Sequence, residues 1–332
     1  MSARFRMDRP APSPKTYSGY SGDMVPTGSK MFDLVLGGGW AIGRVGNIVG
    51  DRSAGKTLLA IEATANFARM FGSKNIGYRE SENAFDEDYA QTVGFPSDVE
   101  PVTGLHTIEK LTDDLQAYLA SLGGREPAMY VIDSLDGYSD EAEMRRELGD
   151  ATYGTQKAKL LSEFFRRNIA VLSEKKCLLL IISQIRENIG VTFGEKYKRA
   201  GGKALDFYCS QVVWLRETGK IKREVSKVSR IVGVDIRMQN KKNKVGLPYR
   251  EAPGSILFSY GFDDETSMLD WLEDTKTELD EKVSSLRATL TRARKTQDRA
   301  TVERLNTYLR KAVDTRWNEI EESLRPTLSK YA

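Results

Sequence analysis

The chain has 332 residues, a net charge of +3 and 40% hydrophobic residues, enough for one large core and an appended element. No apolar run approaches the roughly 18 residues that a membrane helix needs, and residues 1–25 lack the apolar segment of a secretory signal. The single histidine, His106, argues against a histidine metal cluster or a Ser/His/Asp triad. Cys177 and Cys209 lie in apolar surroundings and are predicted to be buried thiols of a cytoplasmic protein with no membrane partner.

The region from Val45 to Val213 alternates short apolar runs with amphipathic stretches, a pattern typical of α/β proteins. The runs before Asp133 and Gln184 are apolar throughout, as in strands that are covered on both faces. A mostly parallel central sheet is therefore expected. Strands are predicted at 45–49, 75–79, 128–133 and 177–183, and helices at 55–71, 108–122 and 155–174.

Three parts of the chain are predicted: a short flexible arm at 1–25, a core at 26–263 and a helical region at 264–332. Later strands, without long helices between them, are expected to extend the sheet in antiparallel fashion, at 211–217, 230–240 and 255–260. The helical region is predicted to be a hairpin with its turn at 295–301. Its apolar stripes are Leu279, Val283, Leu286 and Leu290, then Val302, Leu305, Leu309, Val313, Ile320 and Leu324.

The stretch GDRSAGKT, residues 50–57, has the spacing G-x-x-x-x-G-K-[ST] between a predicted strand and a predicted helix. Glycines let backbone N–H groups turn toward phosphate oxygens, and the helix adds its positive end. Lys56 is predicted to reach the β- and γ-phosphates of ATP, and Thr57 to offer its hydroxyl to Mg²⁺. The predicted nucleotide contacts here are Gly50, Asp51, Arg52, Ser53, Ala54, Gly55, Lys56, Thr57 and Leu58.

Two other strand ends carry acids. The predicted strand 128–133 delivers Asp133 to the carboxyl edge of the sheet, where Asp133 is expected to hold Mg²⁺ together with Thr57, and where Ser134 bonds Asp133 or a water. The strand at 75–79 is followed by Glu80 and Glu82. A carboxylate there is suited to deprotonate a water that attacks the γ-phosphate, although solvated or helix-capping acids fit the spacing equally well.

Together these segments resemble the RecA family of recombinases, which includes bacterial RecA and phage-encoded relatives. The resemblance runs from Val25 to Ala252 and covers most of the chain. It rests on TGS, LGGG and GR before the phosphate loop, on ESENAFDEDYA at 80–90, on VIDS at 131–134, and on SQIRENIGVTFG with GGKALDFY between 183 and 208. It implies a P-loop ATPase core of the RecA type.

The resemblance also implies roles for individual residues. Glu82 corresponds to the catalytic glutamate, Tyr89 to the residue that stacks on adenine, and Asp86 to a contact of its amino group. Gln184, at the exit of a buried strand, corresponds to a γ-phosphate sensor, which suits an amide that both donates and accepts hydrogen bonds. Lys242 and Lys244 match a pair that reaches the γ-phosphate of a neighbouring subunit; without the resemblance they read as a surface basic turn.

Two segments match DNA-binding loops. In the loop that follows Gln184, cationic side chains are expected to meet DNA phosphates and apolar ones to lie among bases. The predicted contacts are Arg186, Ile189, Phe193, Lys196, Lys198, Arg199, Gly201, Gly202 and Lys203. In the loop at 137–156, Arg145 and Arg146 are candidates, with a solvated charged face as the alternative.

The resemblance implies a DNA-dependent ATPase that forms helical filaments on single-stranded DNA and exchanges strands with double-stranded DNA in recombination and repair. A single-strand-binding protein or a loader is an expected further partner. Two alternatives remain: a RecA-core ATPase that assists annealing or helicase loading without strand exchange, and a P-loop kinase of a small molecule. The long basic loop disfavours the kinase.

Overall fold

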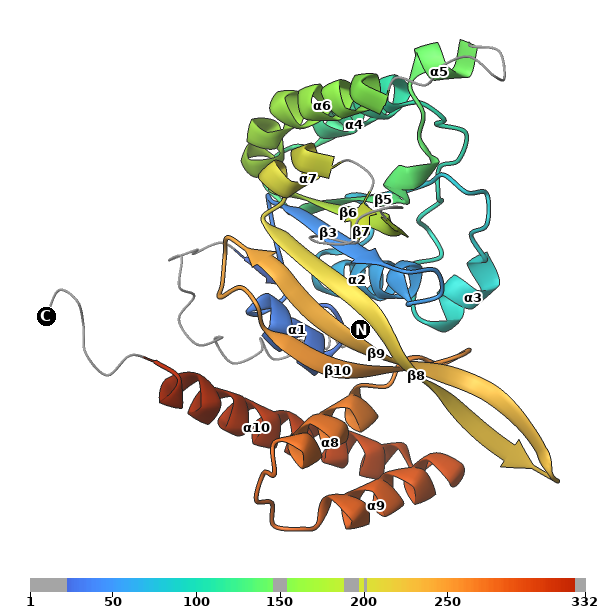
Figure 1. Ribbon diagram of the computed structural model, residues 1–332, viewed down its shortest axis with the longest axis vertical. Coiled ribbons are helices and arrows are strands. Elements are labelled where there is room, and N and C mark those ends of the chain that lie inside the picture. Colours follow the sequence, from blue (N-terminus) through green and yellow to red (C-terminus); the bar gives the residue numbers. More distant parts are fainter. Residues whose placement is uncertain (1–22, 146–153, 188–196, 200–201, 326–332) are drawn as a thin grey trace, which may run out of the picture.

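The computed structural model describes residues 23–145, 154–187, 197–199 and 202–325. Figure 1 shows a central sheet with helices on both faces and a separate group of helices beyond one edge. The helices are α1 (Lys30–Leu36), α2 (Lys56–Phe71), α3 (Glu87–Thr92), α4 (Ile108–Ser121), η1 (Leu135–Gly137, a 3₁₀ turn), α5 (Glu141–Arg145), α6 (Gly154–Glu174), α7 (Gly202–Tyr208), α8 (Asp264–Asp274), α9 (Val283–Lys295) and α10 (Arg299–Ser323).

Strands form two sheets. The small sheet pairs β1 (Met24–Val25) with β2 (Trp40–Ala41). The large one has the order β11-β10-β9-β8-β3-β6-β5-β4, with β7 paired to β6 off this path. Its strands are β3 (Val45–Gly50), β4 (Ile76–Glu80), β5 (Ala128–Asp133), β6 (Cys177–Glu187), β7 (Tyr197–Arg199), β8 (Gln211–Val225), β9 (Val228–Asn243), β10 (Glu251–Leu257) and β11 (Gly261–Phe262).

The predicted α/β fold with a mostly parallel sheet is confirmed. Strands β4, β5, β6, β3 and β8 are parallel to one another, and β9 and β10 continue the sheet beyond β8 in antiparallel fashion. One prediction was wrong: β8, expected to be antiparallel, pairs in parallel with β3. The last strand also begins and ends earlier than 255–260.

Two apolar clusters cover the two faces of the sheet. Alternate residues of β6 divide between them: Leu178, Leu180 and Ile182 face α1 and α2, whereas Leu179 and Ile181 face α4, α6 and α7. Because both faces are covered, polar groups of these strands gather where the strands end. Cys177 and Cys209 are both buried free thiols, as expected.

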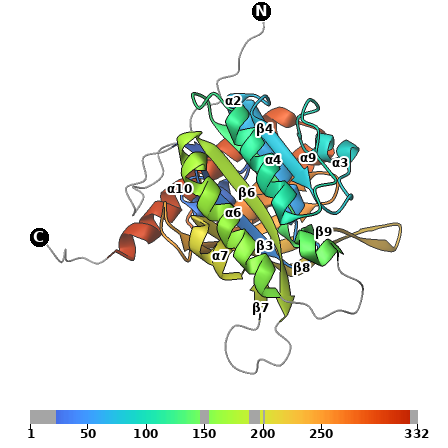
Figure 2. The ribbon, with the colours of Figure 1, turned by 90° about the horizontal axis from the view of Figure 1, so that it is seen from above.

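Strands β8 and β9 extend well beyond the sheet as a two-stranded hairpin, which projects from the body in both views (Figure 1, Figure 2). The pairing continues to Val225 opposite Val228, with irregularities between Val212 and Val213, Glu217 and Gly219, and Ile221 and Lys222. The sequence predicted β8 only at 211–217, since residues 218–225 are rich in charge, whereas the predicted strand at 230–240 covers most of β9. In the part of the chain that the structure describes, no helix is both long enough and apolar enough to cross a membrane.

The C-terminal region contains three helices. The predicted hairpin is confirmed as α9 and α10, joined at Thr296–Asp298, but α8 was missed. The first turn of α8 buries Asp264, Glu265 and Ser267, and the rest of its inner face is the apolar set Met268, Leu269, Trp271 and Leu272. Leu286, Leu290, Leu305, Leu309 and Val313 are buried as expected, in the same cluster as α1 and α2, whereas Leu324 is exposed.

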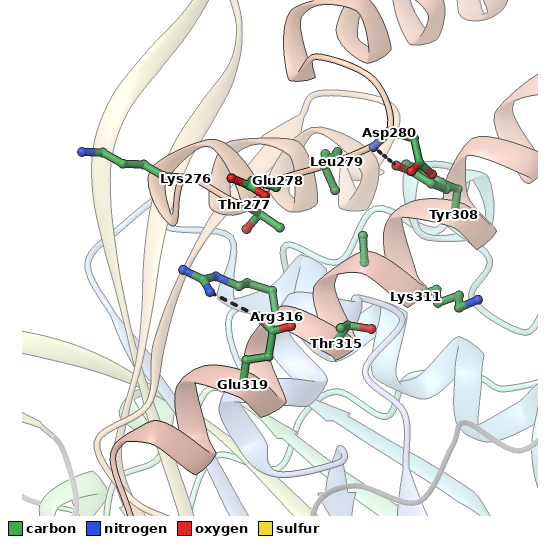
Figure 3. A pocket seen from close by; sticks show the side chains of 11 residues that line it. Lys276, Thr277, Glu278, Leu279, Asp280, Tyr308, Lys311, Thr315, Arg316 and Glu319 are labelled. Atoms are coloured by element: carbon green, nitrogen blue, oxygen red, sulfur yellow. Dashed lines mark hydrogen bonds and ion pairs between the residues drawn. The ribbon is translucent and has the colours of Figure 1, made fainter.

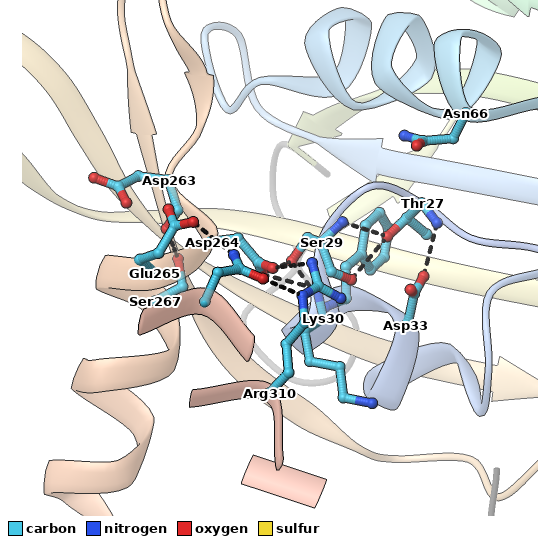
Figure 4. Close-up of polar contacts among 12 residues, drawn as sticks. Thr27, Ser29, Lys30, Asp33, Asn66, Asp263, Asp264, Glu265, Ser267 and Arg310 are labelled. Atoms are coloured by element: carbon cyan, nitrogen blue, oxygen red, sulfur yellow. Dashed lines mark hydrogen bonds and ion pairs between the residues drawn. The ribbon is translucent and has the colours of Figure 1, made fainter. Parts of the chain in front are cut away.

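A buried polar network attaches these helices to the core (Figure 4). The Asp264 carboxylate accepts hydrogen bonds from Ser29 Oγ (3.0 Å) and the Lys30 backbone N–H (2.8 Å), and it pairs with Arg310 at 2.6 Å. Nearby, Arg294 binds both Asp263 oxygens at 2.6 Å and Glu265 at 2.9 Å. Burial raises the pKa of Asp264, and the positive charge of Arg310 opposes that rise. The arginine therefore compensates a carboxylate at the start of α8.

A hollow of about 730 Å³ lies between the α8–α9 connection and α10, lined in part by Lys276, Tyr308, Lys311 and Arg316 (Figure 3). Arg316 donates a hydrogen bond to the Thr275 carbonyl there, at 3.1 Å. None of the site residues predicted from the sequence lines this hollow. The hollow is therefore separate from the predicted nucleotide and DNA contacts.

We predict that Arg310→Ala lowers the free energy of unfolding by about 1–3 kcal/mol at pH 8, because it leaves the buried Asp264 charge uncompensated. The loss should shrink at pH 5: the folded-state pKa of Asp264 is raised, so falling pH protonates the carboxylate in the folded variant and removes the unpaired charge. Urea titration, followed by the fluorescence of the adjacent Trp271 and Trp317, measures both values. Arg304→Ala, on the exposed side of α10, is the control; equal losses in the two variants would contradict the prediction.

Candidate functional site

The predicted phosphate loop connects the end of β3 to the start of α2, as the motif requires. Gly55 has φ +82°, a left-handed backbone angle that favours glycine. Lys56 is buried and its Nζ donates to the Asp51 carbonyl at 2.6 Å. This bond connects the lysine at the end of the loop to the residue near its start. The N-terminus of α2 lies at the carboxyl edge of the sheet, directly after the loop.

Lys56 lies among acids. Burial lowers the pKa of its ammonium, and the negative charges of Asp133, Asp136, Glu82 and Asp51 oppose that change. Lys56 is thus one positive charge beside four carboxylates. Added phosphate charge at this loop needs a further positive charge, which a divalent metal would supply.

Thr57 and Asp133 form the predicted metal-binding pair. Thr57 Oγ1 donates to Asp133 Oδ1 at 3.2 Å, and Tyr78 Oη donates to Asp133 Oδ2 at 2.8 Å. Burial raises the pKa of Asp133 to about 6, while both of these hydrogen bonds oppose the rise. A hydroxyl beside a buried carboxylate provides the hard oxygen ligands that suit Mg²⁺ in a site completed by phosphate and water. Within the described ranges there is no cluster of three His, Cys, Asp or Glu residues that could hold a metal on protein ligands alone.

Glu80 and Glu82, the two acids that follow the predicted strand at 75–79, differ sharply in their surroundings. Glu80 is buried, and its carboxylate accepts the backbone N–H groups of Glu82 (2.9 Å), Asn83 (2.7 Å) and Ala84 (3.3 Å). Both oxygens of Glu80 therefore bind the turn that carries Glu82. Glu82 is exposed, and its Oε1 accepts from Ser134 Oγ at 2.9 Å. Of the two, Glu82 alone can approach a ligand.

Gln184 completes this group. The β3–β6 ladder sets it opposite Gly50, the first residue of the phosphate loop. Its Nε2 donates to Glu82 Oε1 at 3.0 Å, and its backbone N–H donates to Asp136 Oδ2 at 2.7 Å. The structure therefore brings together Lys56, Thr57, Glu82, Asp133, Ser134 and Gln184, which come from four different strand ends.

The residues predicted to contact the base lie at α3. The Asp86 carboxylate accepts the Tyr89 N–H at 2.9 Å and so caps the N-terminus of this helix. Tyr89 is half-buried, packs against the core that includes α2, and has a pKa raised by burial and by the nearby charge of Glu62. Capping is a local role for Asp86 that the resemblance did not suggest.

Lys242 and Lys244 lie at the C-terminal end of α7. Both donate from Nζ to the Phe207 carbonyl, at 3.2 and 3.0 Å, and Lys242 also donates to the Asp206 carbonyl. Cations are favoured at helix C-termini, where carbonyls lack partners. Within one subunit the two lysines therefore stabilise the helix that follows the predicted DNA loop.

The predicted DNA contacts are only partly covered. Arg145 ends α5, is 80% exposed, and pairs with Glu141 at 2.9 Å. Arg186 pairs with Lys198, and Ile185 with Arg199, in the antiparallel β6–β7 ladder, so these backbone positions form a common base for the loop. Gly202 and Lys203 open α7. The remaining contacts lie outside the described residues: Arg146, Ile189, Phe193, Lys196 and Gly201.

Sequence reasoning missed Asp136 and Tyr78. Tyr78 was read as part of an apolar strand, although its hydroxyl bonds Asp133. Asp136 lies in VIDSLDG three residues after Asp133, and its position in that segment was the available signal.

Comparisons with known proteins agree with this geometry. Residues 18–263 match the model of the RecA N-terminal domain family. The chain is similar to Protein RecA of Leifsonia xyli subsp. xyli (strain CTCB07), with 35% identity over 254 residues that make up 75% of this chain and 67% of that relative. The family match spans every strand of the sheet and all the site residues above, and ends before α8. The family match over residues 18–263 and the similarity to that relative show that the chain belongs to the RecA family.

Proposed function

We propose that the protein is an ATP-hydrolysing recombinase that forms filaments on single-stranded DNA and catalyses homologous pairing and strand exchange with double-stranded DNA. The observation that carries the proposal is the 3.0 Å hydrogen bond from Gln184 Nε2 to Glu82 Oε1. It joins the carboxylate suited to hydrolysis directly to the strand that leads into the predicted DNA loop. A small-molecule kinase needs no such connection.

Residues 50–58 would hold the phosphates of ATP through backbone N–H groups and Lys56, with Thr57 and Asp133 holding Mg²⁺. When bound, the metal neutralises phosphate charge at the reacting end of the nucleotide. Tyr89 and Asp86 would define the base side of the site. The lowered pKa of buried Lys56 does not remove its charge role, because four surrounding carboxylates favour the protonated ammonium.

Glu82 would accept a proton from the attacking water, with Ser134 holding its carboxylate in place. The side-chain amide of Gln184 donates a hydrogen bond to Glu82 here, and it could donate to a γ-phosphate instead. A γ-phosphate that draws the amide away would leave Glu82 Oε1 with Ser134 as its remaining hydrogen-bond donor, so that the carboxylate can accept from water, and would shift the end of β6. That shift would pass to the β6–β7 ladder and so to the cationic loop, with ATP binding creating the tight DNA state and hydrolysis releasing it.

Lys242 and Lys244 would act between subunits. In one subunit they cap α7; in a filament they would leave these carbonyls and stabilise the γ-phosphate of a neighbour. Hydrolysis would then depend on subunit stacking. A single-strand-binding protein or a loader remains an expected partner.

An accessory ATPase without strand exchange is the second candidate. The observation in its favour is that α8, α9 and α10 lie beyond the family match. In this reading the protein still binds DNA and hydrolyses ATP, but it assists annealing or helicase loading.

We predict joint molecules between circular single-stranded DNA and a homologous linear duplex when ATP and Mg²⁺ are present, and none with a heterologous duplex. Gel electrophoresis of deproteinised products measures them. DNA-stimulated ATP hydrolysis without joint molecules would favour the accessory function. Turnover that DNA does not stimulate would reject both.

Glu82→Gln should slow DNA-stimulated ATP hydrolysis by about 100-fold or more, because the variant cannot accept the proton. ATP-dependent binding to an oligonucleotide should persist, since the amide keeps an oxygen for Ser134. Asp88→Asn, on the exposed side of α3, serves as the control. Normal hydrolysis in Glu82→Gln would remove this residue from the catalytic role.

Glu80→Ala should also reduce turnover, by about tenfold or more, by releasing three N–H groups that set the position of Glu82. The KM for ATP should change little, because Glu80 does not contact the phosphate loop. Glu80→Gln keeps an acceptor oxygen and should retain more activity than Glu80→Ala. If the two variants are equally impaired, charge rather than position explains the effect.

A further inference from the structure

The segment between the two ladders of β6 has an unusual hydrogen-bond arrangement. The parallel ladder of β6 with β5 ends at Ile181 opposite Ile132. The antiparallel ladder with β7 begins at Ile185 opposite Arg199. Gln184 lies in the gap, where neither strand supplies a partner for its N–H. The Asp136 carboxylate, from the 3₁₀ turn after β5, accepts that N–H at 2.7 Å.

This bond is strong for its kind. A carboxylate acceptor makes a shorter and stronger hydrogen bond than a neutral carbonyl does. Asp136 also comes from η1, which immediately follows the strand of Asp133 and lies at the root of the segment that leads to α5. One side chain thus connects the roots of both predicted DNA loops.

The bond also orients a functional side chain. On the opposite side of β6, the ladder places Gly50 of the phosphate loop beside Gln184. With its N–H held by Asp136 and its position in the ladder set opposite Gly50, Gln184 directs Nε2 at Glu82. Loss of the Asp136 contact removes the acceptor of that N–H, and the side-chain amide then loses its fixed starting point.

We propose that Asp136 is a positioning residue for Gln184: its carboxylate replaces the missing strand partner, and this lets a change at the γ-phosphate move β6 rather than only rotate a side chain. The proposal deepens the proposed function and rests on it. Asp136 touches neither nucleotide nor DNA in this role. It sets how strongly the two are coupled.

The test compares wild type with Asp136→Ala, Asp136→Asn and the control Asp113→Ala, a substitution on the exposed side of α4. The first measurement is the ratio of oligonucleotide Kd without and with a non-hydrolysable ATP analogue. We expect Asp136→Ala to lower this ratio by about tenfold or more when the analogue is saturating for every variant, a condition that is needed because Asp136 is also one of the acids near Lys56. Asp136→Asn, whose amide oxygen still accepts the Gln184 N–H, should keep most of the ratio.

The second measurement is hydrogen–deuterium exchange of the Gln184 amide, which needs no DNA. Exchange should accelerate in Asp136→Ala and stay slow in Asp136→Asn and Asp113→Ala. An unchanged ratio, or unchanged exchange, in Asp136→Ala would overturn the proposal. Equal losses in the Ala and Asn variants would overturn it too, since charge alone would then explain them.

These measurements distinguish a failure of the proposed function from a failure of the role of Asp136. A wild-type protein whose oligonucleotide affinity ignores the analogue would reject the proposed function, and the exchange rates would still decide whether Asp136 holds Gln184. A wild type that responds to the analogue, with an Asp136→Ala variant that responds equally, would reject the role of Asp136 and leave the proposed function intact.

Discussion

The parallel pairing of β3 with β6 is the constraint on which the site depends. It fixes Gly50 opposite Gln184, so the start of the phosphate loop and the predicted sensor share one edge of the sheet. The β4–β5 pairing does the same for Glu80 and Asp133. Both faces of these strands are covered by helices, which leaves their carboxyl ends as the place where polar side chains can meet.

Within this edge, acids of similar appearance have separate tasks because their surroundings differ. The Glu80 carboxylate accepts hydrogen bonds from three backbone N–H groups, and the Asp133 carboxylate accepts them from the hydroxyls of Thr57 and Tyr78. The Asp136 carboxylate accepts the backbone N–H of Gln184. The Glu82 carboxylate is exposed, and among the described residues its hydrogen-bond donors are the side chains of Ser134 and Gln184, not the backbone. Three carboxylates that bind the frame of the site thus lie around one that is held by these two side chains. That division suits a site in which a single contact must change while the frame stays in place.

The C-terminal helices are joined to this frame without taking part in it. Their apolar residues merge with the cluster around α1, and the Asp264–Arg310 pair bridges α8 and α10 beside Ser29 and Lys30. The contact is polar at the start of α8, where two carboxylates and a serine are buried, and apolar along the rest of that helix, where Met268, Leu269, Trp271 and Leu272 are buried.

Local patterns were sufficient for much of the molecule. The phosphate loop, the four buried strands and their helices follow from the order of apolar and glycine residues over short stretches, and the structure agrees with them. The resemblance supplied Glu82 and Gln184, but not how they meet. Only the tertiary structure showed what Glu80 does, revealed Asp136 and Tyr78 as supporting residues, and set β8 parallel to β3. The Tyr78–Asp133 and Asp136–Gln184 bonds join residues 55 and 48 positions apart, and the strand pairs that place them join still more distant residues, such as Gly50 and Gln184. The bonds of Glu80 are local, but they form only in the particular turn that follows β4. A pattern of residue types read along the chain contains neither kind of information.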